Sequence, residues 1–179
     1  MKVGVASLGL VPVHLEAVES PSEVGIEADA ATFAAPVHIA VKLTRMQEDV
    51  LAQGTARTVA RMQCSRCLED VDLSLHGRFD ALYMPKTREP EANRRRDRDD
   101  QRINYYSEFT IDLSADIAES LVLELPLRPL CSPTCAGLCP SCGANRNTER
   151  CSCPAVKPDD PFAALRDLVP PDDSGPSEG

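Results

Sequence analysis

The sequence predicts an α+β fold: an antiparallel β-sheet in the N-terminal half, a helix that covers it, and a small C-terminal zinc-knuckle module. Three observations carry this prediction. Apolar and polar residues alternate over three stretches between residues 37 and 81, which is the pattern of half-buried strands. An apolar residue recurs every four positions between residues 113 and 125, as in an amphipathic helix. Finally, six of the eight cysteines lie between Cys131 and Cys153.

The three stretches form the predicted β core, residues 36 to 85. In residues 36 to 45, Val37, Ile39, Val41 and Leu43 share one face. Residues 50 to 62 line one face with alanine and glycine, and residues 71 to 81 turn every second, mostly apolar residue inward. The connection between these two strands contains Cys64 and Cys67. We therefore expect this Cys-x-x-Cys pair at the tip of a hairpin.

The other segments follow from composition and local signals. Residues 1 to 35 are expected to be loosely ordered, with an edge strand near residues 11 to 18, and the polar residues 86 to 102 to form a flexible charged linker. Residues 103 to 130 complete the core with a strand over residues 103 to 111 and a helix that Ser114 caps and Pro126 ends. Tyr105, Tyr106 and Phe109 are expected in the core. Residues 131 to 169 form the cysteine-rich module with a short terminal helix, and residues 170 to 179 a disordered tail.

The cysteine spacing points to zinc. Two thiolates three positions apart in a tight turn can reach one cation, as in Cys139-Pro140-Ser141-Cys142, and a following glycine lets backbone amides turn toward the sulfurs. Eight cysteines divide into two tetrahedral sites with none left over. We predict two zinc ions per chain. The eight predicted ligands are Cys64, Cys67, Cys131, Cys135, Cys139, Cys142, Cys151 and Cys153.

Two groupings of these ligands are open. The preferred one joins Cys64 and Cys67 to the Cys131/Cys135 pair, and the Cys139 knuckle to Cys151 and Cys153, because it uses every thiol. The alternative makes one local site of Cys131, Cys135, Cys139 and Cys142. Disulfides and redox chemistry are the rival interpretations. The absence of a signal-peptide pattern in the first residues favours a reducing cytoplasm, and a thioredoxin-like strand-to-helix setting is lacking.

Charge limits the functional classes. The formal charge is -9, and residues 86 to 102, with 7 basic and 5 acidic side chains, are the most basic stretch. A non-specific nucleic-acid binder is therefore disfavoured, since phosphate affinity comes from clustered Lys and Arg. An enzyme is disfavoured too, because two closed four-thiolate sites leave no position for a substrate. RNA contacts, if made, would involve basic residues of the linker and the second knuckle: Arg94, Arg95, Arg96, Arg98, Arg146 and Arg150.

These motifs, in this order, resemble the bacterial YceD family, named for accumulation of large ribosomal subunit RNA. The resemblance spans about residues 37 to 169. It is carried by C-S-R-C-L-E at Cys64, L-P-L-R-P-L-C ending at Cys131, G-L-C-P-S-C-G-A-N around Cys139, and C-S-C ending at Cys153. The segment I-D-L ending at Leu113 and a closing D-P-F motif at residues 160 to 162 add to it.

The resemblance implies a non-enzymatic, cytoplasmic factor in ribosome biogenesis that supports synthesis, processing or accumulation of large-subunit rRNA. The acidic charge leads us to expect that it meets the large-subunit precursor through a basic ribosomal protein or assembly factor, with weak direct rRNA contact. The alternative is a zinc-dependent protein adaptor or a transcription-associated zinc ribbon without a ribosomal role. No run of residues is apolar enough for a membrane helix.

Overall fold

The structure is a computed structural model that describes residues 1–9, 11–88 and 102–153. Its strands are β1 (Lys2–Gly4), β2 (Val13–Glu19), β3 (Thr32–Phe33), β4 (Val37–Met46), β5 (Asp49–Gln63), β6 (Asp70–Pro85), β7 (Arg102–Tyr106) and β8 (Thr110–Asp112). The helices are α1 (Pro21–Val24) and α3 (Ser114–Val122), with 3-10 turns η1 (Val5–Ser7) and η2 (Lys86–Arg88).

The described residues form one large sheet with the strand order β2-β4-β5-β6-β7, and β3 pairs with one end of β5. The β2–β4, β4–β5 and β5–β6 pairs are antiparallel, as predicted. β6 and β7 are parallel, which the sequence pattern did not indicate. A parallel pair needs a long connection so that the chain can return to the start of its partner. The predicted linker supplies that length, and most of it, residues 89–101, lies outside the described residues.

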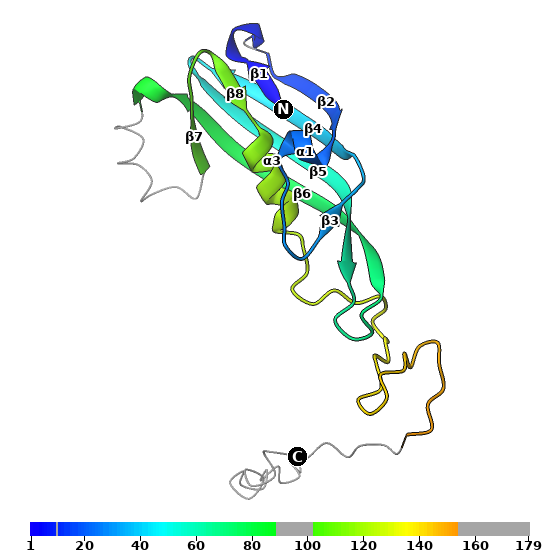
Figure 1. Cartoon of the computed structure of the whole chain (residues 1–179). Helices are drawn as coiled ribbons and strands as arrows, with labels where there is room; N and C mark the ends of the chain where they lie inside the picture. The colour runs from blue at the N-terminus through cyan, green and yellow to red at the C-terminus, as the bar shows by residue number, and fades with distance from the viewer. Residues whose placement is uncertain (10, 89–101, 154–179) are drawn as a thin grey trace, which may run out of the picture.

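One face of the sheet forms the core, and the predicted periodicity is confirmed there. Val37, Ile39, Val41 and Leu43 of β4 are all buried, and the residues between them are exposed. The small residues of β5 and Leu75, Phe79 and Ala81 of β6 continue the same apolar layer. Helix α3 lies across this layer over β5 and β6 (Figure 1). Its Ile117 and Leu121 are fully buried.

A close approach between β6 and α3 sets the position of the helix. A Cβ added at Gly77 would lie 2.5 Å from Ser120 Oγ and 2.7 Å from the Ser120 backbone. A buried polar group helps to fix the helix start. Asp116, 3% exposed, accepts hydrogen bonds from the Tyr83 hydroxyl and, at 2.8 Å, from Asn104 Nδ2. These bonds give the buried carboxylate the partners that it needs, and they join β6 and β7 to the helix.

The start of α3 differs from the prediction. Ser114 is the first helical residue and not the N-cap, which is Leu113, a residue without a capping side chain. Asp112 Oδ1 instead accepts the Ser114 N–H at 3.0 Å. A carboxylate just outside the first turn satisfies a backbone donor as a cap would. The helix also ends at Val122, earlier than the predicted residue 125, and tighter bonds such as Leu125 N–H to the Val122 carbonyl follow.

The single strand expected over residues 103 to 111 is two strands. β7 pairs with β6, a tight turn reverses the chain, and β8 pairs with β1. Glu108 and Phe109 both adopt a φ of 52°, a left-handed turn conformation that interrupts a strand. Tyr106 is buried as expected, and Phe109 is 71% exposed, contrary to expectation. Apolar and β-branched composition alone does not reveal this turn.

The first 35 residues carry more regular structure than their composition indicates. β2 is an edge strand, as predicted, and it pairs with β4 along its whole length. β1 pairs with β8, and α1 begins with a capping box between Ser20 and Glu23. Val5 and Val24 are buried in the core. Pairing with strands distant in sequence orders this segment, and a local pattern does not contain that information.

Candidate metal centres

The Cys-x-x-Cys pair of the first knuckle lies at the tip of the β5–β6 hairpin, as predicted. Cys64 N–H donates to the Glu69 carbonyl at 2.8 Å, and Leu68 N–H donates to the Cys64 carbonyl at 3.0 Å. The long hairpin extends beyond the core to the cysteine-rich segment (Figure 1). The paired strands therefore hold both thiols at one end of the molecule's main sheet.

The second knuckle repeats this hydrogen-bond pattern position for position. Cys139 N–H donates to the Ala144 carbonyl at 2.8 Å, and Gly143 N–H donates to the Cys139 carbonyl at 2.9 Å. The residue after the second cysteine has a left-handed backbone in both knuckles, with φ of 62° at Leu68 and 76° at Gly143. Glycine adopts this conformation at no steric cost, so the leucine of the first knuckle is the strained one.

Backbone amides turned toward sulfur make the first cysteine of each knuckle acidic. Hydrogen bonds from the N–H groups of Cys67, Arg66 and Cys131 lower the pKa of Cys64 to about 6. Those of Cys142 and Ser141 lower the pKa of Cys139 to about 6. A thiol with a lowered pKa is readily deprotonated, and the thiolate is the form that binds a metal.

In each group, the neighbouring thiols make one member hard to ionise. The neighbouring thiols, Cys135 foremost, raise the pKa of Cys131 to about 12. In the second group, Cys142 foremost raises the pKa of Cys153 to about 12. Like charges held close together cannot all form without compensation. A bound divalent cation would provide that compensation and allow four thiolates in one cluster.

The structure gathers the first four cysteines from two segments that lie far apart in the sequence. Cys64 Sγ lies 3.8 Å from Cys135 Sγ, and Cys67 Sγ lies 3.6 Å from Cys131 Sγ. All four sulfurs lie within 4.8 Å of one another. Cys64, Cys67 and Cys135 are buried, Cys131 is exposed, and Leu130 and Leu138 pack against the cluster.

The remaining four cysteines form the second cluster. The sulfurs of Cys139, Cys142, Cys151 and Cys153 also lie within 4.8 Å of one another. Cys139 is buried, and the other three are exposed or half-buried. This is the grouping preferred from the sequence; the local site of Cys131, Cys135, Cys139 and Cys142 is not the one that forms.

The sulfur–sulfur distances of the first cluster fit a tetrahedral metal ion. A zinc–sulfur bond of about 2.3 Å implies sulfur–sulfur edges of about 3.8 Å in a regular tetrahedron. The distances of 3.8 and 3.6 Å in the first cluster match that geometry. Two groups of four cysteines could thus each hold a metal ion.

The two clusters are packed against each other at Arg66. Its carbonyl accepts the Leu138 N–H at 3.0 Å, and its Nη1 donates to the Cys135 carbonyl at 2.9 Å. Gly137 lies at this junction with a φ of 71°, and a Cβ there would approach the Arg66 carbonyl oxygen to 3.1 Å. The second knuckle therefore packs directly against the hairpin tip.

The arginines considered for RNA contact have different positions. Arg94, Arg95, Arg96 and Arg98 lie outside the described residues. Arg146 and Arg150 are exposed in the loop between Cys142 and Cys151, and Arg146 N–H donates to the Gly137 carbonyl at 2.9 Å. The structure does not bring these two side chains together with other basic groups into a described cluster.

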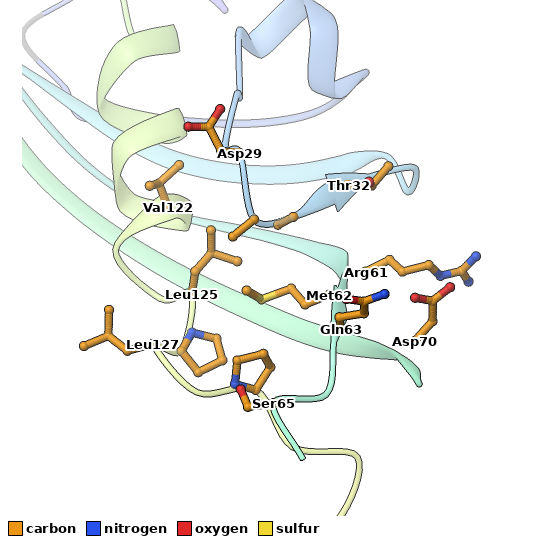
Figure 2. A pocket seen from close by; sticks show the side chains of 14 residues that line it. Asp29, Thr32, Arg61, Met62, Gln63, Ser65, Asp70, Val122, Leu125 and Leu127 are labelled. Atoms are coloured by element: carbon orange, nitrogen blue, oxygen red, sulfur yellow. The ribbon is translucent and has the colours of Figure 1, made fainter. Parts of the chain in front are cut away.

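A cleft of about 740 Å³ lies between the core and the first cluster (Figure 2). Met62, Val122 and Leu125 line its apolar part, and Arg61 and Asp70 lie at its polar end. The segment after α3 forms one wall, where Leu127 is fully exposed at 102%. This wall contains the Leu-Pro-Leu-Arg-Pro-Leu sequence that leads into Cys131.

Sequence patterning alone does not reveal a second surface, the face of the sheet that points away from α3. His14, His38 and His76, the three histidines of the chain, all lie on this face with Arg57 and Arg78. The alternation of each strand assigns these residues to polar faces. Only the register between strands shows that they are neighbours.

Two features define the structural class. One face of the large sheet is left uncovered by the described residues, and the tip of the β5–β6 hairpin takes part in the first of two adjoining four-cysteine clusters. The comparisons with known proteins give the family. The chain belongs to the YceD family: the family model described as "Large ribosomal RNA subunit accumulation protein YceD" matches residues 52–169. No solved structure matches the chain.

Relatives occur in bacteria and plants. An uncharacterized protein of Mycobacterium tuberculosis is 31% identical over 147 residues, covering 80% of this chain and 69% of the relative. An uncharacterized protein of Mycobacterium leprae is 28% identical over 164 residues, covering 92% and 73%. The Zea mays protein named "Large ribosomal RNA subunit accumulation protein YCED homolog 1, chloroplastic" is 30% identical over 142 residues, covering 66% and 48%. No helix among the described residues is long and apolar enough to cross a membrane.

Proposed function

We propose that this protein is a non-enzymatic ribosome-biogenesis factor that supports synthesis, processing or accumulation of large-subunit rRNA in the cytoplasm. The observation that carries the proposal is the family match over residues 52–169, which spans both cysteine clusters. The family's name and the names of the plant relatives point to large-subunit rRNA. Eight free cysteines are compatible with a reducing compartment.

We propose further that each cluster binds one zinc ion in a structural role. Four-thiolate zinc sites are closed, so the ion holds chain segments together and leaves no coordination position for a substrate. In the first cluster the ion would join the β5–β6 hairpin to the segment around Cys131 and Cys135. In the second it would fix the loop that follows Cys142. Metal binding then contributes directly to the folding free energy of this small module.

The proposed partner is a basic ribosomal protein or assembly factor on the large-subunit precursor. The layer that covers the core face of the sheet is acidic. In residues 1–8, 20–31 and 110–125 the only basic side chain is Lys2, which lies 3.9 Å from Asp112. The acidic residues of this layer are Glu23, Glu27, Asp29, Asp112, Asp116, Glu119 and Glu124, of which only Asp116 is buried. Such a surface favours a positively charged protein and repels phosphate.

Depletion and sedimentation together test the function. Depleting the protein should lower mature large-subunit rRNA relative to small-subunit rRNA, and the tagged protein should comigrate with large-subunit precursors on a gradient. Re-expression of the wild-type chain should restore the rRNA ratio. An unchanged ratio, with the protein sedimenting away from ribosomal particles, would contradict the proposal.

The second candidate is a zinc-dependent protein adaptor without a ribosomal role. The exposed Leu127 at the 740 Å³ cleft favours it, because an exposed apolar side chain at a cleft commonly marks a protein contact. The same gradient separates the two candidates. An adaptor would comigrate with another complex, and depletion would leave the rRNA ratio unchanged.

A further inference from the structure

The open face of the sheet carries a compact group of basic side chains in this acidic chain. Strand register places His38 opposite Arg57, and Arg57 opposite His76, in one row across β4, β5 and β6. One pleat further along, Arg78 lies opposite Thr55, and then Lys42 lies opposite both His14 and Gln53. Neighbouring strands are about 4.8 Å apart, so these side chains share one compact patch.

The cations of the patch are available to a ligand. Lys42, Arg57 and Arg78 are exposed, and none of them forms a salt bridge within the described part of the chain. Two carboxylates, Glu16 and Asp80, lie within the patch. Further along the same face, beyond the patch, are Asp70 and Asp72, and Asp72 is paired with Arg61 at 2.7 Å. Asp80 already accepts a hydrogen bond from Gln53 Nε2 at 2.9 Å. The three permanent cations of the patch therefore outnumber its two acids.

The shape of this face also suits an extended ligand. Two hollows, of about 480 and 450 Å³, lie side by side and share Glu16, Ala40 and Thr55 in their lining. Of the shared residues, Ala40 and Thr55 are small and Glu16 carries a carboxylate; His38 and Arg57 line one hollow, and Lys42 and Arg78 line the other. A strand of nucleic acid can approach a low floor between two sets of basic side chains.

We propose that this open face binds the phosphate backbone of an RNA strand in the large-subunit precursor. The proposal rests on the proposed function for its choice of RNA, and charge complementarity carries it. Phe79 is the one aromatic residue among the described residues that line the hollows, and it is buried in the core at 7% exposure. Stacking on aromatic rings is the usual means of gripping bases, so the contact here is to phosphate and is nearly independent of base sequence.

The two faces of the sheet then have different partners. The acidic layer over the core face meets a basic protein, and the open face meets RNA. This arrangement explains how a chain with a formal charge of -9 can touch rRNA: three cations that form no salt bridge among the described residues lie together on one side of the sheet.

The test is a titration of a fluorescent, mixed-sequence single-stranded oligoribonucleotide with the zinc-loaded full chain at several salt concentrations. Lys42→Ser, Arg57→Ser and Arg78→Ser together should lower affinity at low salt by at least about tenfold and make the slope of log K against log salt shallower by about 2, or about 0.7 for each lost phosphate contact. The residues are exposed, so the fold should persist. Arg57→Lys with Arg78→Lys keeps the charges and should bind like wild type.

Matched controls locate the contact. Lys2→Ser with Arg128→Ser removes positive charge elsewhere and should leave both affinity and slope unchanged. Replacing Arg94, Arg95, Arg96 and Arg98 by serine should lower RNA affinity less than the sheet-face triple variant does. If the linker variant loses binding and the sheet-face triple variant does not, the proposal is wrong.

The combined results distinguish the open-face proposal from the proposed function. If wild type supports rRNA accumulation but the triple variant binds oligoribonucleotide normally, only the open-face proposal fails. If depletion leaves the rRNA ratio unchanged, the proposed function fails whatever the oligonucleotide does. A third outcome concerns association with precursor particles on the gradient. If this association survives ribonuclease treatment for the wild-type protein but is lost in the triple variant, the open face binds an acidic protein, and the RNA assignment is overturned.

Discussion

Asn147 Nδ2 donates a hydrogen bond to Cys135 Sγ at 3.3 Å, although the two residues belong to different halves of the cysteine-rich segment. Asn147 lies in the loop between Cys142 and Cys151 of the second cluster, and Cys135 belongs to the first. The same amide accepts the Ala136 N–H at 2.8 Å, and Asn145 Oδ1 accepts from it at 2.9 Å. Burial would raise the pKa of Cys135, but this bond and the Gly137 N–H lower it. The loop of one cluster therefore supports a ligand of the other.

Asn147→Ala should weaken metal binding at the first cluster. The substitution removes the bond to Cys135 Sγ without touching any cysteine. Loss of such a supporting hydrogen bond typically lowers metal affinity about 10- to 100-fold. In a chelator competition, one of two zinc ions should therefore leave more readily than in wild type. Thr148→Ala, in the same exposed loop, is the control and should behave like wild type. Equal release kinetics for Asn147→Ala and wild type would contradict this role.

Elemental analysis of protein purified without chelator should find two zinc ions per chain, and single cysteine substitutions should separate them. Cys64→Ser should loosen the hairpin tip and destabilise the β half. Cys151→Ser should chiefly disorder residues 136 to 153. Hydrogen exchange would map each effect. One zinc in wild type, or loss of both ions with equal ease from either variant, would rule out two separate sites.

Leu68→Gly should stabilise the first knuckle. Leu68 has a φ of 62° and a side chain that is 55% exposed, so the strain relieved exceeds the packing lost. We expect a gain of about 1 kcal/mol in the free energy of unfolding, since the left-handed backbone costs a non-glycine residue about 1–2 kcal/mol. The reverse change, Gly143→Leu, should destabilise by a similar amount. Denaturant unfolding of the zinc-loaded protein measures both. A destabilised Leu68→Gly would show that this leucine makes a contact worth more than its strain.

Gly77→Ala should displace α3 from the sheet. The added Cβ would meet the Ser120 backbone at 2.7 Å, a distance that only movement of the helix can relieve. Overpacking of this kind costs about 1–3 kcal/mol. Gly4→Ala is the control, because its nearest neighbour, Ser7 Oγ, is 3.9 Å away and its φ is -75°. Thermal unfolding should show a lower midpoint for Gly77→Ala alone. Equal midpoints for wild type and Gly77→Ala would mean that α3 accommodates the added Cβ without loss of stability.

Much of this protein can be predicted from its sequence, because the relevant signals are local. Alternation over residues 37 to 81 determines which side chains of β4, β5 and β6 face the core. The Cys-x-x-Cys spacing determines the two knuckles, since a tight turn alone brings two sulfurs to one point. The even number of cysteines and their pairing make the two-cluster grouping the simplest one.

Tertiary structure decided the features that depend on register and on contacts distant in sequence. The order of the N-terminal segment comes from pairing with β4 and β8, and the parallel β6–β7 pair from a long connection. The support of Cys135 by Asn147 requires the two clusters to be packed together. The row of His38, Arg57 and His76 depends on which residues lie opposite each other, because alternation assigns each side chain to a face and only the pairing of strands makes them neighbours.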